Sequence, residues 1–187
     1  MKILLTIISI LLTAIRPAHA LEIEGVAIPP SLELQSHSLT LNGAGLRTFS
    51  LLMVPIKIYV AAFYSPSPLR SEKAVAASPG PLAFTFTFLR SVGKADVAKA
   101  WRSQFQASNS HIYSGLQKDI DCFISMFGAL DSGGVQMVQF TNTDTRIFDQ
   151  GTLKGSIPGR DFQLSFLSLW FGKNAVSLDL KKALLGQ

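Results

Sequence analysis

Arg47 and Tyr59 stand out in a segment that otherwise has the composition of a buried strand. The segment "GAGLRTFSLLMVPIKIYVAAFY" starts at Gly43, is mostly apolar, and carries the arginine and, twelve residues later, the tyrosine. A guanidinium has five N–H donors and a phenol has one O–H donor. Because such groups are costly to bury without partners, each calls for a partner from a ligand or from the protein. Taken singly, Arg47 could pair with a structural acid or point to solvent, and Tyr59 could be a core tyrosine with a satisfied hydroxyl.

The other reactive side chains point away from metal, cofactor and nucleophile chemistry. His37 and His111 lack a second ligand at metal spacing, so we expect no metal site. "GAG" at Gly43 lacks the third glycine and the following helix of a dinucleotide-binding loop. Neither a serine nucleophile elbow nor a close carboxylate pair is present. Cys122 lies in "IDCFISMF", where apolar neighbours predict a buried, unreactive thiol. We therefore expect no cofactor.

Residues 1–20 have the three regions of a secretory signal peptide. Lys2 forms a short positive start, Ile3–Ile15 is dominated by apolar residues, and Ala18–Ala20 places small residues where a signal peptidase reads them. A transmembrane anchor is the alternative, and it is disfavoured because the apolar stretch is shorter than the roughly 20 residues that span a bilayer. We expect cleavage to leave a single domain, 21–187, in the periplasm or outside the cell.

The chain is only mildly basic once that segment is removed. The whole sequence has 17 basic and 12 acidic residues, and its net charge is +5. Lys2 and Arg16 belong to the expected signal, so its removal lowers the net charge to +3. No extended basic run follows, so a nucleic-acid partner is not expected. No later segment is long and apolar enough to predict a membrane span.

Alternation predicts strands in several segments. "LAFTFTFLR", from Leu82, alternates phenylalanine with threonine, and "VPIKIYVAAFY", from Val54, is rich in β-branched and aromatic residues. Alternation in the second segment places two sets of side chains on opposite faces: Lys57, Tyr59, Ala61 and Phe63 on one, and Ile56, Ile58, Val60 and Ala62 on the other. Gly43 and Gly45 predict a bulge or a close backbone approach. "LEIEGVAIPP", from Leu21, predicts one edge strand followed by a turn.

Helical spacing marks much of the remainder. Val97, Trp101 and Phe105 recur at i, i+4 and i+8, and similar spacing continues after them as far as Phe127. Further helices are expected at Ser71–Ala77, from an N-terminal Asp161 to Gly172, and after the capping residue Ser177. Strands thus occur in two groups with helices between and after them. This order indicates an α+β fold with a largely antiparallel sheet.

Three segments occur together in one order between Leu39 and Gly186: "LNGAGLRTFSLLMVPIKIYVAAFY", "GTLKGSIPGRDFQLSFLSLWFG" and "NAVSLDLKKALLG". In this combination they resemble the chalcone isomerase-like family, in its exported bacterial branch. The resemblance implies an open-faced β-sandwich, in which a helical layer covers a large antiparallel sheet. It places the third segment in the helix pair that closes the ligand cleft. Because the family contains enzymes and non-enzymes, membership alone does not decide the function.

The resemblance also implies roles for single residues. Arg47 matches the arginine that the family places in its cleft. Tyr59 stands where the isomerases carry a threonine that helps to polarise the substrate ketone, and Leu169 aligns with their substrate-contacting threonine. The isomerases' tyrosine and asparagine on the helix after "FTFTFLR" have no clear counterpart, although Trp101 and Arg102 lie in that neighbourhood. An arginine and a tyrosine without these threonines are similar to the fatty-acid-binding members, in which the pair holds the ligand's carboxylate.

This combination favours a non-catalytic protein that binds a fatty acid or similar hydrophobic carboxylate through Arg47 and Tyr59. A guanidinium matches a carboxylate with two parallel donors, and the phenol adds a third. The alternative is an intramolecular lyase of the chalcone isomerase type, acting on phenolic enones, with Arg47 positioning the substrate and Tyr59 donating to the ketone. Leu169 argues against it, because an apolar side chain cannot replace a hydroxyl. A scaffold with a vestigial cleft, working through a protein contact, is a third possibility.

Overall fold

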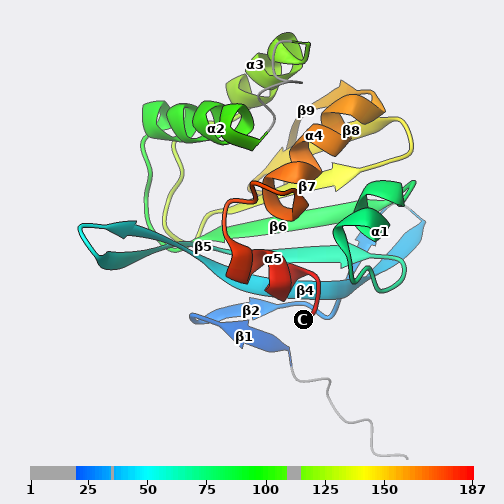
Figure 1. Ribbon diagram of the computed structural model, residues 1–187, viewed down its shortest axis with the longest axis horizontal. Coiled ribbons are helices and arrows are strands. Elements are labelled where there is room, and N and C mark those ends of the chain that lie inside the picture. The colour runs from blue at the N-terminus through cyan, green and yellow to red at the C-terminus, as the bar shows by residue number, and fades with distance from the viewer. Residues whose placement is uncertain (1–19, 35, 109–114) are drawn as a thin grey trace, which may run out of the picture.

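The fold is built on an antiparallel sheet whose strands lie side by side in chain order (Figure 1). The computed structural model describes residues 20–34, 36–108 and 115–187. All but the last residue of the expected signal peptide, and also His111, therefore lie outside the described residues. The seven strands of the sheet are β3 (Ser31–Leu34), β4 (His37–Leu51), β5 (Val54–Ser65), β6 (Leu82–Phe88), β7 (Val135–Phe140), β8 (Asp144–Asp149) and β9 (Thr152–Pro158).

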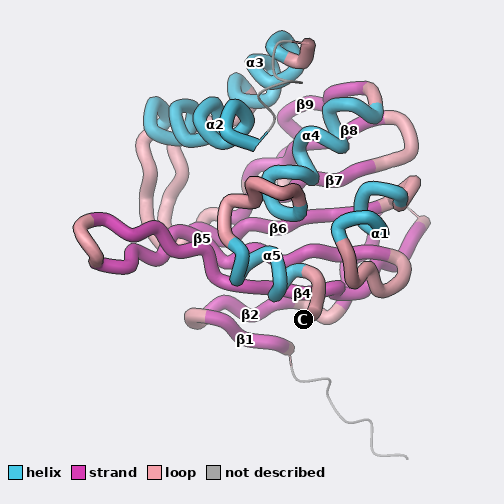
Figure 2. Tube along the Cα trace, in the orientation of Figure 1, coloured by secondary structure: helices cyan, strands magenta, loops and turns pink. Residues whose placement is uncertain are grey.

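Helices cover one face of this sheet, as the tube view makes plain (Figure 2). In the described part of the chain they are α1 (Glu72–Ala77), α2 (Lys94–Ser108), α3 (Gln117–Ser125), α4 (Arg160–Phe171) and α5 (Leu178–Leu184). Each contributes apolar side chains to one core cluster shared with the sheet. The predicted α+β class, with a helical layer on a large antiparallel sheet, is confirmed.

The two faces of β5 belong to two different cores. Ala61 and Phe63 are fully buried in the main core beneath the helices. Val60 and Ala62 are buried on the opposite side, in a smaller core that the hairpin of β1 (Leu21–Ile23) and β2 (Val26–Ile28) helps to cover. The alternation of the sequence therefore assigned these four side chains to the correct faces.

The N-terminal segment forms a hairpin, so the prediction of one edge strand there was wrong. β1 and β2 pair with each other as a separate two-stranded sheet. The chain reverses at Glu24 and Gly25, whose φ angles are 52° and 77°. Positive φ at both central residues is typical of a two-residue hairpin turn. Alternation alone did not reveal this turn because the apolar pattern continues through it.

The helix boundaries agree with the sequence at α1 and α5. The helical spacing expected to continue as far as Phe127 is realised in α3 only over Gln117–Ser125. Ser177 caps α5, because its side chain accepts a hydrogen bond from the Leu180 N–H at 3.2 Å. The predicted start of α4 at Asp161 was wrong, because the helix begins one residue earlier, at Arg160. Gly159 is the N-cap there, with a φ of 96°, and Asp161 lies within the first turn. A carboxylate in that place still interacts favourably with the helix dipole.

Gly43 and Gly45 have the close backbone approach that the sequence predicted, and β4 is also irregular between Leu41 and Gly43. A Cβ atom on Gly43 would overlap the Ala183 carbonyl oxygen and would lie 2.8 Å from the Leu184 oxygen. A Cβ on Gly45 would lie 2.8 Å from the Ala183 Cβ. The two glycines thus allow α5 to lie directly on β4.

Cys122 is exposed, so the prediction of a buried thiol was wrong. α3 turns Ile120, Phe123 and Ile124 toward the core. A residue two positions after Ile120 lies on roughly the opposite side of a helix, and Cys122 therefore faces outward. Its apolar neighbours in sequence are not its neighbours on the helix surface.

Candidate functional site

Arg47 on β4 and Tyr59 on β5 are direct cross-strand partners. The chain reverses at Leu52 and Met53, so residues twelve apart in sequence meet across the hairpin. Directly opposed residues on antiparallel strands project to the same face of the sheet. Tyr59 packs against the main core, which places the pair on the face that the helices cover. The expectation that the two side chains lie together is met by this register, whereas their binding of a ligand remains a prediction.

Tyr59 lies at the edge of an aromatic cluster formed by β6 and α4. The centroid of its ring lies 5.4 Å from that of Phe86 and 5.7 Å from that of Phe88, and both contacts have edge-on geometry. The Trp170 Nε1–H on α4 donates a hydrogen bond to the Tyr59 hydroxyl oxygen at 3.3 Å. Because indole nitrogen only donates, the Tyr59 oxygen is the acceptor and its own O–H remains able to donate.

Burial keeps this phenol neutral. It raises the pKa of Tyr59 from 10.0 to about 12, against the smaller opposing effects of the Trp170 hydrogen bond and the Arg47 charge. An apolar environment disfavours the phenolate more than these two partners favour it. Tyr59 therefore retains a proton to donate across the physiological pH range.

Arg47 is half-buried and has no carboxylate partner in the described part of the chain. Its Nη1 donates to the carbonyl oxygen of the adjacent residue, Thr48. None of the ion pairs among the described residues includes Arg47, and the nearby Lys57 pairs with Glu24 at 2.6 Å. Pairing with a structural acid, the alternative considered for Arg47, is therefore not observed there. The site is a cation beside a neutral hydrogen-bond donor, which is suited to an anion.

Comparison with known proteins agrees with this fold. A family model described as chalcone isomerase-like matches residues 20–186. The chain belongs to the chalcone isomerase-like family. Among solved structures, the fatty-acid binding protein AtFAP1 of Arabidopsis thaliana is similar, with a TM-score of 0.66 and 16% sequence identity over 86% of this chain and 92% of that one. The search of curated proteins found no match.

In this chalcone isomerase-like protein, α4 presents a leucine and a tryptophan to the main core, and the tryptophan contacts the pair. Leu169, which the resemblance aligns with a threonine of the isomerases, is fully buried in the main core. Trp170, the next residue, supplies the hydrogen bond to Tyr59. No spacing signal links it to Tyr59, since the two are 111 residues apart.

The helix after β6 offers an aromatic but no polar group to this region. Trp101 on α2 is half-buried, and its ring lies 5.9 Å from that of Trp170. Arg102 is exposed and pairs with Asp121 on α3 at 2.8 Å. The chalcone isomerase-like protein thus places Trp101 toward the aromatic cluster and uses Arg102 to join two helices.

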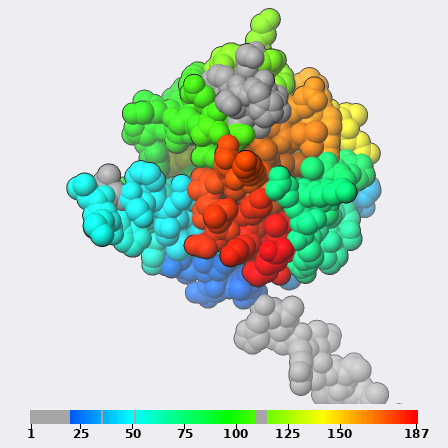
Figure 3. All heavy atoms as spheres, viewed as in Figure 1, coloured from blue at the N-terminus to red at the C-terminus, as the bar shows by residue number. Residues whose placement is uncertain are grey.

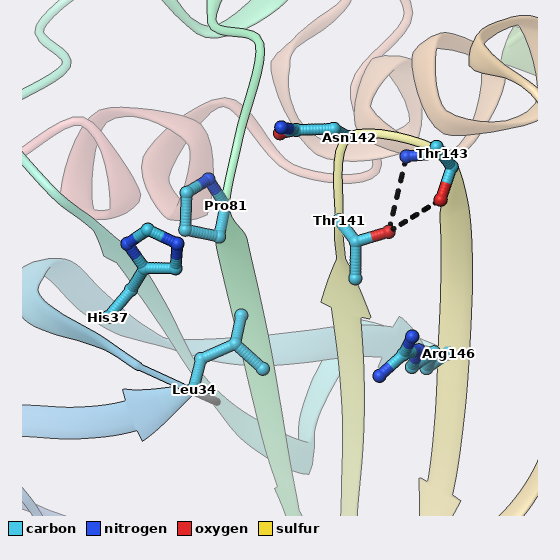
Figure 4. Close-up of a pocket in the computed structure, with 7 residues that line it drawn as sticks. All are labelled: Leu34, His37, Pro81, Thr141, Asn142, Thr143 and Arg146. Atoms are coloured by element: carbon cyan, nitrogen blue, oxygen red, sulfur yellow. Dashed lines mark hydrogen bonds between the residues drawn. The ribbon is translucent and has the colours of Figure 1, made fainter.

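Among the described residues of the chalcone isomerase-like protein, two of the cavities lie away from the pair. The larger, of about 230 Å³, lies at the ends of β6, β7 and β8 that are remote from the pair (Figure 4). The close-up shows hydrogen bonds between the Thr141 hydroxyl and both the hydroxyl and the backbone N–H of Thr143. Its lining is Leu34, His37, Pro81, Thr141, Asn142, Thr143 and Arg146. The smaller, of about 60 Å³, lies between α1 and α4. Neither is lined by Arg47 or Tyr59. Across the described residues, no cluster of three His, Cys, Asp or Glu side chains could hold a metal ion.

Proposed function

We propose that this chalcone isomerase-like protein is a non-catalytic binder of a fatty acid or a similar hydrophobic carboxylate. The observation that carries the proposal is the cross-strand pair of Arg47 and Tyr59 on the helix-covered face. A half-buried guanidinium without a carboxylate partner among the described residues favours a ligand that brings its own negative charge.

The head group would receive donors from both strands. The guanidinium of Arg47 offers two parallel N–H groups to the two carboxylate oxygens, and the neutral Tyr59 hydroxyl offers one more. The Trp170 N–H orients that hydroxyl, because it occupies the oxygen of Tyr59 as an acceptor and leaves the O–H for the ligand. Such chains of hydrogen bonds polarise one another in a low-dielectric environment.

The acyl chain would pack along the aromatic side chains that adjoin the pair. Phe86 and Phe88 contact the Tyr59 ring, and Trp170 contacts Phe86 at 5.2 Å between ring centroids. Each buried methylene contributes about 0.8 kcal/mol, so a medium chain gains several kcal/mol before the cost of ordering it. The similarity to AtFAP1, a fatty-acid binding protein of the same fold, supports this ligand class.

The alternative function is an intramolecular lyase acting on chalcone-like phenolic enones. The Tyr59 O–H, held neutral by burial, is a plausible donor to a substrate ketone. Leu169 opposes this function, because the resemblance aligns this fully buried leucine with a substrate-contacting threonine of the isomerases, and an apolar side chain cannot replace a hydroxyl. We expect no cyclisation of a chalcone above its spontaneous rate. Measured acceleration that disappears in Tyr59→Phe would favour the lyase instead.

We also propose that the protein works after export, in the periplasm or outside the cell. The proposal rests on the signal-like sequence of residues 1–20. Determination of the N-terminus of protein recovered from the exported fraction tests it. A mature chain that begins at Leu21 is expected, and an intact chain retained in the cytoplasm would contradict export.

The binding experiment compares two site variants with two matched controls. Native mass spectrometry and calorimetry with dodecanoate should show binding to the wild type, a roughly tenfold or greater loss in Arg47→Ala, and a smaller loss in Tyr59→Phe. Arg102→Ala removes an exposed arginine that pairs elsewhere, and Tyr64→Phe removes a hydroxyl that donates to the Pro29 carbonyl. Both controls should bind like the wild type. Equal binding by all five proteins would overturn the assignment of the site.

A further inference from the structure

The hairpin of β4 and β5 extends beyond the rest of the sheet as a two-stranded arm, Thr48–Lys57. β5 pairs with β6 only from Tyr59 onward, and β3 pairs with β4 only as far as Thr40. The two halves of the arm therefore pair with each other alone. Figure 1 shows the arm projecting from one end of the sheet, and Figure 3 shows the same cyan segment standing out from the body of the molecule.

Large apolar side chains occupy the tip of this arm. Leu52 is 91% exposed and Met53 is 96% exposed, and they are flanked by Val54 at 61% and Phe49 at 51%. Single exposed apolar residues are ordinary on protein surfaces, whereas several in one place mark an interaction site. These side chains protrude at the end of a narrow arm and do not line a groove.

The turn at the tip holds Leu52 and Met53 in backbone conformations that bulky residues disfavour. Leu52 and Met53 have φ angles of 49° and 67°, the signature of a type I′ hairpin turn. Asn-Gly is the favoured pair in such a turn, because these residues adopt positive φ at little cost. Bulky apolar residues in strained conformations are found where the strain serves a function.

Charge is arranged along the arm so that cations lie behind the apolar tip. The arm contains Lys57 and no acidic residue. Arg90 is exposed at its root, next to Leu89, whose N–H donates to the Ile58 carbonyl at 2.9 Å. Glu24, on the hairpin of β1 and β2, pairs with Lys57 at 2.6 Å. Arg47, on β4 immediately before the arm, adds a third cation.

The distance between charge and tip matches the depth of a bilayer interface. Lys57 lies three residues from Val54, which corresponds to about 10 Å along a strand. Apolar groups of interfacial proteins enter the boundary between head groups and acyl chains by about 5–10 Å, while basic residues remain at the level of the phosphates. A stable protein interface buries about 800 Å² on each partner, which calls for a broader surface than this tip.

We propose that the β4–β5 arm docks on an anionic lipid bilayer, with Leu52 and Met53 inserted among the acyl chains and Lys57 and Arg90 facing the phosphates. In the described part of the chain, no helix is long and apolar enough to cross a membrane. This docking does not depend on carboxylate binding by the neighbouring pair.

Vesicle flotation with a double variant tests the proposal. The wild type should bind vesicles of phosphatidylglycerol and phosphatidylethanolamine, and bind phosphatidylcholine vesicles much less. Leu52→Asn/Met53→Gly should lower the vesicle partition coefficient roughly tenfold or more, because two apolar side chains leave the tip. The new pair suits the turn, so the melting temperature should be equal or higher. Leu153→Ser, which removes a 54% exposed leucine from β9, should bind vesicles like the wild type.

Three outcomes would overturn the proposal: a wild type that does not float with anionic vesicles, a double variant that floats equally, or a wild-type dimer in light scattering that the double variant abolishes. The last would assign the tip to a second copy of the chain. All proteins are prepared with the same N-terminus, so any affinity of residues 1–20 is common to them. Dodecanoate binding by the double variant is measured in parallel, which separates failure of the arm from failure of the carboxylate site.

Discussion

Arg47 and Tyr59 oppose each other across β4 and β5, and the indole of Trp170 donates to the same Tyr59 hydroxyl at 3.3 Å. This arrangement brings a cation, a neutral phenol and an indole N–H together from three elements of the fold. The phenol is the central member, because it accepts from one neighbour and can still donate.

Trp170→Phe should disturb the phenol without removing it. The change deletes the N–H that bonds to Tyr59, and we expect a loss of about 1–2 kcal/mol in the free energy of unfolding. Affinity for dodecanoate should fall several-fold, because the hydroxyl loses its orienting partner. Chemical unfolding and calorimetry measure the two effects. Trp101→Phe is the matched control, since Trp101 has only ring contacts with this cluster; an affinity loss as large in the control would assign the effect to packing alone.

The stability of the protein should fall as pH rises from 10 to 12. Burial raises the pKa of Tyr59 from 10.0 to about 12, and that of Tyr64 in the same way. Between these values the unfolded chain releases protons that the native state still holds, so the free energy of unfolding decreases with pH. Below pH 10 both states hold the protons and this contribution is fully present.

Urea unfolding of wild type and Tyr59→Phe across this range isolates the contribution of Tyr59. The wild type should lose about 2 kcal/mol more than the variant between pH 9.5 and pH 12. Ionisation of lysines affects both proteins equally and cancels in the comparison. Parallel stability curves would show that the Tyr59 hydroxyl is not shielded from water.

Gly43→Ala should destabilise the contact between β4 and α5. The new Cβ would overlap the Ala183 carbonyl oxygen and lie 2.8 Å from that of Leu184, so α5 would have to shift. Overpacking against backbone typically costs 1–3 kcal/mol, and we expect about 2 kcal/mol here by urea unfolding. Gly128→Ala is the control, because a Cβ there meets no atom within 4 Å; it should change stability by less than about 0.5 kcal/mol. Equal effects of the two substitutions would contradict this account of the helix contact.

Cys122 should react with a thiol reagent in the native protein. The side chain is exposed on the outer side of α3. We expect Ellman's reagent to label one thiol per chain without denaturant, at a rate that changes little on unfolding. Cys122→Ser should abolish the signal and leave the stability within about 0.5 kcal/mol of the wild type. If labelling required denaturant, the result would support the buried thiol that the sequence predicted.

Much of the architecture could be predicted from local pattern. In β5, β6 and α2, the apolar residues recur with the period of a single element that has one buried side. This periodicity depends only on residues close together in sequence, so it can be recognised without the tertiary structure. The cap of α5 at Ser177 was equally local. Pattern failed where the relevant neighbours are not sequence neighbours: Cys122 was judged by "IDCFISMF", although its position on the helix decides its exposure.

The sequence by itself determined the family, the α+β class, and the presence of an arginine and a tyrosine in one apolar hairpin. Only the tertiary structure decided that these two residues are in register, that Trp170 reaches the phenol from 111 residues away, and that Gly43 lies beneath α5. The physical reason is that periodicity depends on the geometry of a single element, whereas a hydrogen bond or a close contact between elements depends on how they pack. Strand register adds to this, since the irregularity after Arg47 shifts the pairing by a residue that no local signal predicts.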